Sequence, residues 1–287
     1  MDLFLEQVLN GLAIGALYAL ITLGLALVYG ILRILHVAHA AVYSVGAYLG
    51  LWVFSWSGSL LVAAFLAMAG CALFGVAIER LVYFPLLKYP PYVPLIASIA
   101  VLLGTEEVCR LIAGPYILAF PAQLPFPSLK LGPLVFSPPL LAVYLMAGVV
   151  LLGLWYIVGR TELGLAMRAV SQSRAMADAL GMNSHLIITF TFVLGSAIAA
   201  LAGILVGIYY NQVYPTMGAV PAYKSLAIIV VGGLGSVSGS VAASLLLGLA
   251  ETLLIGFADI PLPRDALAFM AMIGVLMWRS EGLFGSK

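Results

Sequence analysis

The chain has 287 residues, of which 64% are hydrophobic and 8% are charged. Soluble domains carry about 25% charged residues, so this composition excludes a fold that needs a polar exterior in water. It indicates an all-α protein that crosses a lipid bilayer several times, and the net charge of +1 does not favour a nucleic-acid partner.

Apolar segments that could each cross a bilayer, which takes about 20 residues per helix, follow one another along the chain. In order they are Val8–Ile31, Leu35–Phe54, Leu60–Val82, Val93–Ala113, Pro139–Val158, Leu186–Tyr210, Val241–Phe257 and Leu262–Trp278. Between the sixth and seventh, Tyr223–Gly239 predicts a short span or a re-entrant piece. We therefore expect residues 1–287 to form a single transmembrane domain, a polytopic bundle of about eight or nine transmembrane helices with one short or broken segment at 223–240.

Small residues recur at every fourth position in the first and sixth segments. They are Gly11, Gly15 and Ala19 in the first, and Gly195, Ala199, Gly203 and Gly207 in the sixth. Stripes of small side chains let two helix backbones approach closely in lipid. We therefore predict that these glycines are helix-packing positions.

Polar and charged side chains interrupt several apolar segments. They are His36 and His39 at the second, Glu106, Glu107 and Arg110 in the fourth, and Glu251 in the seventh. Glu106 and Arg110 lie four positions apart and are predicted to pair on one helix face. Glu251 is predicted to face protein rather than lipid.

The longest basic connection, 159–185, is predicted to contain a short amphipathic helix at Ala166–Leu180. Gly181 is placed to end it, because glycine accepts the left-handed conformation at a helix C-terminus. Such a helix is suited either to docking a partner or to resting on anionic lipid headgroups.

The stretch Gly232–Ser240 contains four glycines and three serines. Irregular backbone at membrane depth is tolerated only where protein or water surrounds it. The stretch therefore predicts either a broken helix that contributes to a ligand pathway or a tight hairpin on the cytoplasmic side.

Basic residues in short loops mark the cytoplasmic side of a membrane protein. If 159–185 is cytoplasmic, alternation places the N-terminus outside, in the periplasm, and the C-terminus inside, provided that Tyr223–Gly239 crosses. Most Lys and Arg residues then lie inside, and the outer ones are Lys130, Lys224 and Arg264. We expect a multi-pass protein of the bacterial inner membrane.

Several stretches resemble the branched-chain (hydrophobic) amino-acid ABC permeases, in the same order from about residue 8 to 285. They are Asn10–Leu20 with Leu23–Leu25 and Val28–Gly30, Arg168–Arg174 with Ala179–Asn183, Phe192–Gly203, Val231–Ser236, Leu247–Glu251 and Arg279–Gly285. One departure is His36–Ala40, where the family has an Asn-Phe-Ala-His-Gly-like stretch. His39 is retained there, but the asparagine and glycine positions differ.

The resemblance implies a permease subunit of an ATP-driven importer that translocates branched-chain or other hydrophobic amino acids. Its partners would be a second, similar permease, two ATP-binding cassette subunits, a periplasmic substrate-binding protein and membrane lipid. The chain would not itself be an enzyme and would have no catalytic residue, metal or cofactor, since ATP and Mg²⁺ would bind the ATPase subunits. The sequence has no GxxxxGK[ST] phosphate-binding loop, which agrees with this division of labour.

The resemblance also implies roles for individual residues. Coupling to the ATPase would involve Arg168, Ala169, Ser171, Arg174, Ala179 and Gly181. Candidates for the translocation path are Asn10, Tyr18, His39, Tyr43, Gly232, Gly233, Gly235 and Ser236.

Three alternatives stay open at the level of the sequence. The same class of transporter could import urea, an amide or an aromatic acid. An ion-coupled carrier would work without nucleotide. An intramembrane protease is suggested by Glu106-Glu107-Val108-Cys109-Arg110, but against an EExxxR signature the arginine is one residue early, which rotates it by about 100° on a helix.

Overall fold

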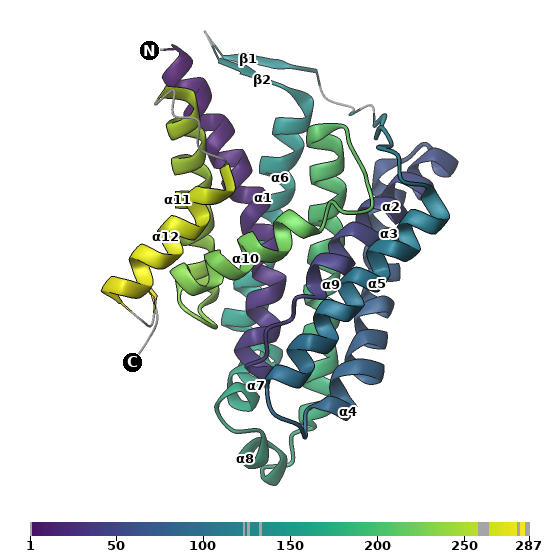
Figure 1. The fold of residues 1–287 in the computed structure, drawn as a ribbon, viewed down its shortest axis with the longest axis vertical. Helices are drawn as coiled ribbons and strands as arrows, with labels where there is room; N and C mark the ends of the chain where they lie inside the picture. The colour runs from purple at the N-terminus through teal and green to yellow at the C-terminus, as the bar shows by residue number, and fades with distance from the viewer. Residues whose placement is uncertain are drawn as a thin grey trace.

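The computed structural model describes residues 2–122, 124, 127–131, 134–257, 264–279 and 282–284, without the side chains of Asp2, Leu131 and Arg264. It is a helical bundle with one small two-stranded hairpin (Figure 1). In chain order the elements are α1 (Asp2–Leu32), α2 (His39–Ser57), α3 (Leu60–Ile78), η1 (Glu79–Tyr83, a π-helical turn), α4 (Phe84–Leu86), α5 (Tyr92–Ala113), β1 (Leu129–Leu131), β2 (Leu134–Phe136), α6 (Pro138–Arg160), α7 (Glu162–Gln172), α8 (Arg174–Ala179), α9 (Ser184–Tyr210), α10 (Ala219–Gly232), α11 (Val237–Phe257) and α12 (Arg264–Trp278).

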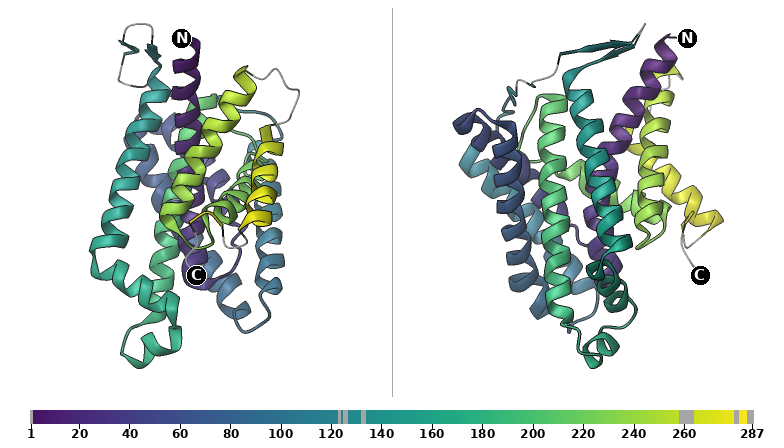
Figure 2. Two further views of the ribbon diagram at one scale, coloured as in Figure 1. Left: turned by 90° about the vertical axis from the view of Figure 1, so that its left-hand side faces the viewer. Right: turned by 180° about the vertical axis from the view of Figure 1, so that it is seen from behind.

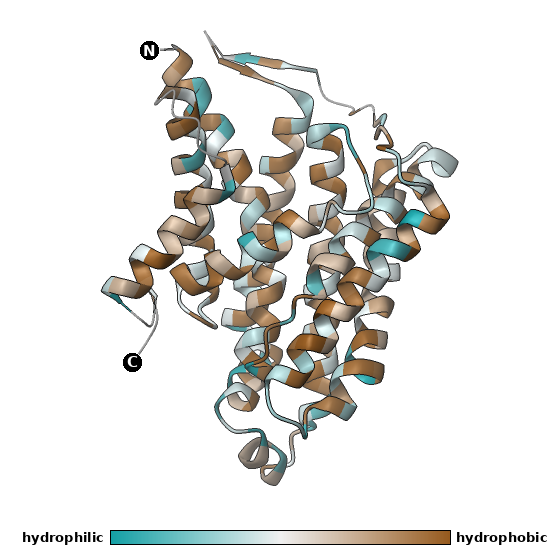
Figure 3. Ribbon diagram, viewed as in Figure 1, coloured by the Kyte–Doolittle hydropathy of each residue, from teal (hydrophilic) through white to brown (hydrophobic). Residues whose placement is uncertain are grey.

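Five helices of the described chain are long and apolar enough to cross a bilayer. They are Leu3–Leu32, Leu60–Leu86, Pro138–Arg160, Ser184–Tyr210 and Val237–Phe257, whereas α10 and α12 are apolar but shorter. Large apolar side chains such as Phe65 and Leu152 are 73% and 69% exposed, and hydrophobic residues cover most of the length of the bundle helices (Figure 3). The protein is therefore a multi-pass membrane protein of the all-α class, while eight or nine crossings remain a prediction.

The bundle is built around α1. Most of its apolar span is buried, and α11 lies antiparallel beside it (Figures 1 and 2). A Cβ atom built on Gly15 would lie 2.8 Å from the Cα atom of Leu245, and one built on Gly248 would meet the backbone of Gly15. Only glycine allows this approach, which agrees with the packing role predicted for Gly11 and Gly15.

Helix α9 contacts α1, α2 and α3. A Cβ atom on Gly195 would lie 3.1 Å from the carbonyl oxygen of Gly24 in α1, and one on Gly203 would meet the carbonyl of Tyr43 in α2. Gly207 instead lies near the side chains of Phe120 and Val213. The stripe predicted in the sixth segment therefore serves several neighbours rather than one.

The two ends of the bundle differ. The N-terminus, β1 and β2 lie at one end, whereas α7 and α8 project from the other (Figure 2). The hairpin, in which Lys130 is paired with Val135, was not expected from the sequence.

Two stretches of the bundle interior are not helical. Residues 33–38 delay the start of α2 to His39, and Arg33 has a φ of 53°. Residues 211–218 precede α10 and are held by reciprocal backbone hydrogen bonds of 2.8 Å between Leu118 and Val213. Helix α10 then runs obliquely across the bundle (Figure 1).

The expected break at 223–240 is narrower than predicted. Residues up to Gly232 are helical, and only a short turn, in which Gly233 and Gly235 have φ of 100° and 83°, separates α10 from α11. The break thus has the form of the tight hairpin that the sequence offered as one of two alternatives. The first residues of the predicted last span, Leu262–Trp278, lie outside the described part of the chain, as do Ser280, Glu281 and Lys287.

Candidate functional site

A cavity of about 250 Å³ lies where α1, α2, α9, the 211–218 connection, α10 and α12 meet. Tyr18 and Tyr43, both predicted as path residues, are in its wall. Gln212 and Tyr214 enter from the non-helical connection, which replaces a helical turn at this point. Because this connection is not a helix, it can present side chains to the cavity that a continuous span would point elsewhere.

A buried ion pair forms the polar edge of this cavity. Lys224 of α10 lies with its Nζ atom 2.9 and 3.0 Å from the two carboxylate oxygens of Glu251 in α11, and both side chains are at most 3% exposed. Lys224 also donates to the hydroxyl of Tyr18 at 2.8 Å, and that hydroxyl donates to Glu251 at 2.8 Å. Charged side chains inside a membrane protein are costly and pair with one another, so this arrangement stabilises both charges.

A second carboxylate reaches the same lysine from α12. Asp265 Oδ1 lies 3.2 Å from Nζ of Lys224, and its side chain is 41% exposed. Its other oxygen accepts a hydrogen bond of 2.6 Å from the hydroxyl of Tyr223. The cluster of Lys224, Glu251 and Asp265, called the charge cluster below, therefore joins α10, α11 and α12, and its contacts with Tyr18 connect it to α1.

Other predicted path residues lie away from the cavity. Asn10 is on α1 near its first turns, and Gly232, Gly233, Gly235 and Ser236 form the end of α10 and the turn before α11. In that turn the backbone of Ser236 donates to the carbonyl of Gly233 at 3.0 Å. The structure gives these glycines a turn-forming role.

His39 belongs to a separate buried cluster. Its ring and that of His36 are 5.6 Å apart, and Nδ1 of His36 lies 2.6 Å from the hydroxyl of Tyr83. Tyr83 is on the π-helical turn η1, and Phe192 of α9 packs against both Tyr83 and His36. Both histidines therefore lie where the 33–38 stretch and the start of α2 meet η1 and α9.

The predicted pair of Glu106 and Arg110 is wrong. Arg110 instead bonds Glu107 at 2.9 Å, and this pair is exposed. Glu106 points into the protein and is buried. Glu106 and Glu107 are adjacent and therefore about 100° apart on the helix, so α5 turns Glu107 outward together with Arg110.

The connection 159–185 contains two helices, α7 and α8, rather than the single helix predicted for Ala166–Leu180. Ser173 separates them in an extended conformation, and its hydroxyl accepts a hydrogen bond from the backbone N–H of Met176. Serine competes in this way with the helical backbone and is favoured at helix N-caps. The predicted cap is confirmed, since Gly181 has a φ of 86° and its N–H bonds the carbonyl of Asp178.

The residues proposed for coupling are distributed over this pair of helices. Arg168, Ala169 and Ser171 are on α7, where the guanidinium of Arg168 bonds the carbonyl of Val158 and Ser171 donates to the carbonyl of Arg168 at 2.8 Å. Arg174 and Ala179 are the first and last residues of α8. A guanidinium nitrogen of Arg174 lies 3.2 Å from Nε2 of His185 in α9. Both helices are thus tied to the bundle.

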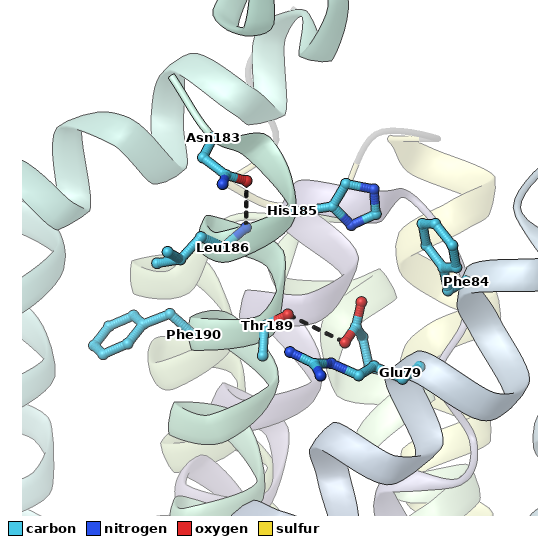
Figure 4. Close-up of a pocket in the computed structure, with 8 residues that line it drawn as sticks. Glu79, Phe84, Asn183, His185, Leu186, Thr189 and Phe190 are labelled. Carbon is cyan, nitrogen blue, oxygen red and sulfur yellow. Dashed lines mark hydrogen bonds between the residues drawn. The ribbon is translucent and has the colours of Figure 1, made fainter. Parts of the chain in front are cut away.

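A groove of about 520 Å³ opens beside these helices (Figure 4). On one wall, Asn183 caps α9 by accepting from the backbone of Leu186 at 3.1 Å. Thr189 donates to the carboxylate of Glu79, on η1, at 3.2 Å. The ring of Phe84 packs against His185 with 4.5 Å between centroids. The start of α9 is therefore in direct contact with η1 and α4.

Residues 7–277 match the family described as the permease component of branched-chain amino acid transport systems. The chain belongs to the branched-chain amino acid permease family. Among its relatives, the high-affinity branched-chain amino acid transport system permease protein BraD of Pseudomonas aeruginosa is 33% identical over 98% of this chain and 96% of its own length. LivH of Escherichia coli K12, described in the same words, is 31% identical over the same shares. Among solved structures, PsaBC from Streptococcus pneumoniae in complex with Fab is 13% identical, with a TM-score of 0.43 over 95% of this chain and 87% of that chain.

Sequence reasoning missed two residues of this permease that line its cavity. Lys224 was assigned to an outer loop, but it is 2% exposed within α10, and Asp265 was not considered. A signal was present, because Lys224 and Glu251 are charges of opposite sign in two successive apolar segments. Each is expensive in lipid alone, so their pairing could have been anticipated.

Proposed function

We propose that this permease is the membrane-spanning subunit of an ATP-driven importer and that it translocates branched-chain or other hydrophobic amino acids. The observation that carries this proposal is the pair α7 and α8, which projects beyond the apolar bundle and is fixed to it at both ends. In this proposal the end that bears α7 and α8 is cytoplasmic, the N-terminus is periplasmic, and the membrane is the bacterial inner membrane.

The attachment of α7 and α8 suits a coupling element. The hydroxyl of Thr161 caps α7, Ser173 caps α8 and Asn183 caps α9, so each helix start is fixed by a side chain. A carboxylate oxygen of Asp178 also accepts from the backbone of Ser184 at 3.2 Å. An ATPase subunit that moves α8 would consequently move α9, because the hydrogen-bonded connection between the two helices leaves them little freedom to move independently.

The expected partners follow from the proposal that this chain forms the membrane pathway while other subunits supply the energy and the cargo. Two ATP-binding cassette subunits would grip α7 and α8 and bind ATP and Mg²⁺, a second similar permease would complete the pathway, and a periplasmic binding protein would deliver the amino acid. The apolar wall of the cavity, which includes Leu17 and Val206, suits an apolar side chain.

The test is reconstitution in proteoliposomes with the second permease, the ATPase subunits and the binding protein. Uptake of radiolabelled leucine should require all components and ATP. Leucine flux through this chain without nucleotide would contradict the proposal and favour an ion-coupled carrier. ATP-dependent uptake of urea or of an aromatic acid, but not of leucine, would retain the transporter class and reject the substrate.

A further inference from the structure

The charge cluster holds one positive and two negative side chains at the edge of the cavity. Lys224 has three N–H donors, and its neighbours are Glu251, the hydroxyl of Tyr18 and Asp265. With one lysine and two carboxylates the cluster has a formal excess of one negative charge. It is therefore not a closed, neutral ion pair of the kind that serves only to join helices.

The two carboxylates are not equivalent. Glu251 is 2% exposed and contacts Nζ with both oxygens at 2.9 and 3.0 Å. Asp265 is 41% exposed, contacts Nζ with one oxygen at the longer distance of 3.2 Å and lies in the cavity wall. Of the two carboxylate partners of Lys224, Asp265 is thus the one that a molecule in the cavity can reach and replace.

We propose that a zwitterionic amino acid is held by inserting between Lys224 and Asp265, with its carboxylate on Lys224 and its ammonium group on Asp265. This inference rests on the proposed transport function and names the residues that would recognise the cargo. The bond between Asp265 and Tyr223 keeps the aspartate in place when its contact with Lys224 opens.

Charge balance gives the site its selectivity. A zwitterion adds no net charge, and each of its charged groups finds an opposite partner, so no bare charge is created at membrane depth. An amine without a carboxylate would bind Asp265 and open its contact with Lys224. Nothing in the ligand would then replace Asp265 as a partner of Lys224. An organic anion adds a second excess negative charge to the cluster, and like charges at close range are unfavourable.

The rest of the cavity fits the remainder of such a ligand. Apolar side chains make up part of its lining, namely Ile14, Leu17, Ile21, Val206 and Met217. The volume of about 250 Å³ is below the range of about 300–1,000 Å³ that is typical of sites for drug-sized ligands. A small amino acid with an apolar side chain therefore matches both the volume and the mixed lining of the cavity.

The test uses the reconstituted complete transporter supplied with loaded binding protein. The double variant Lys224→Met/Glu251→Gln removes the site's positive charge without leaving a buried charge unpaired, so the bundle is expected to fold. Leucine uptake should fall by about tenfold or more, as is typical when one partner of a buried charged contact is removed, while ATPase activity and thermal stability stay near wild type. Wild-type uptake in the double variant would overturn the inference and assign the cluster a purely structural role.

A second variant serves if the double variant does not assemble. Asp265→Asn keeps Lys224 paired with Glu251 and should still lower leucine uptake by about tenfold, because the ammonium group loses its partner. Unchanged uptake would overturn the inference. The matched control is Glu107→Gln/Arg110→Met, which removes the exposed pair on α5 and should leave uptake unchanged.

Binding measurements separate recognition from assembly. Radiolabelled leucine bound to the purified wild-type transporter without binding protein should be displaced by leucine, but not by isoamylamine or 4-methylpentanoate, which lack the carboxylate and the ammonium group respectively. Displacement by either analogue would also overturn the inference. Failure of the wild-type transporter to take up leucine with ATP and binding protein would instead reject the proposed function itself.

Discussion

Charged residues and glycines occur both at the buried centre of the bundle and on its outer surface, called the rim below, but their surroundings give them different energetic roles. At the centre, Lys224 and Glu251 are almost fully buried, and Gly15 is in backbone contact with α11. At the rim, Arg110 and Glu107 are 43% and 59% exposed, and a Cβ atom added to Gly148 would meet no described atom within 4 Å. An intramembrane charge or glycine therefore has energetic importance only through what surrounds it.

The largest expected effect is on the buried ion pair. Glu251→Ala removes the main partner of Lys224, and breaking a buried pair costs about 3 kcal/mol or more. Glu107→Ala at the rim should cost no more than about 0.5 kcal/mol, because exposed pairs are weak. Melting temperatures of the two purified variants in detergent measure the difference, and equal shifts would abolish the distinction between centre and rim.

Glycine substitutions should show the next largest effect. Gly15→Ala places a methyl group 2.8 Å from the Cα atom of Leu245, and overpacking of this kind costs about 1–3 kcal/mol. Gly148→Ala should instead stabilise the protein by about 0.5 kcal/mol through helix propensity. The same thermal measurement checks both signs. A stabilised Gly15→Ala variant would mean that α1 and α11 are not in close contact.

Gly181 is a third kind of glycine. It is required for its left-handed backbone conformation and not for lack of space around it. Its φ is 86° with no described atom within 4 Å of an added Cβ, so Gly181→Val strains the backbone by about 1–2 kcal/mol without a clash. We expect the variant to fold and to hydrolyse ATP in the complete transporter with reduced leucine uptake. Gly181→Asn, which tolerates the left-handed conformation, should retain uptake; normal uptake by the valine variant would remove this residue from the coupling argument.

The smallest expected effect is at the junction of α8 and α9. The hydroxyl of Ser184 near the Asp178 carboxylate, together with the Ser184 backbone N–H that donates to it, lowers the pKa of the Asp178 carboxyl below its ordinary value. This contribution is present above the ordinary aspartate pKa of about 3.9 and is lost as the pH falls through the lowered pKa. Hydrogen exchange in residues 176–186 should therefore be faster in Asp178→Asn than in wild type at pH about 6, and equal in both below the lowered pKa. A constant difference at all pH values would contradict this.

Much of the fold could be predicted from hydropathy. The third to seventh apolar segments became helices with boundaries within a few residues of the prediction, since apolar length decides where a chain crosses lipid. Helix α1 begins at Asp2, earlier than the predicted Val8. The start of α2 was placed too early, because Val37 is apolar although residues 33–38 are not helical. The break at Ser173 was missed because the Ser173 side chain caps the start of α8, and hydropathy does not report such a cap.

The cavity could be predicted only in part. Tyr18 and Tyr43 were predicted as path residues, and both line the cavity, while their role in transport stays a prediction; Glu251 does face protein. The pairing of Lys224 with Glu251 could have been anticipated from their opposite charges, but the place of Asp265 beside them could not, since α12 meets α10 only through tertiary packing. The glycines near residue 233 attracted attention by their number, although their geometry is that of a turn.

The direct contact of Gly195 in α9 with Gly24 in α1 has a mechanical consequence. A helix of 27 residues such as α9 is a stiff rod about 40 Å long, and no flexible side chain cushions it where the two backbones touch. A tilt of α9 that begins near Asn183 therefore moves α1 as well, because the two backbones are in direct contact. The stiffness of that crossing, more than the strength of any single bond, therefore determines how much of a displacement at one end of α9 is transmitted along the bundle.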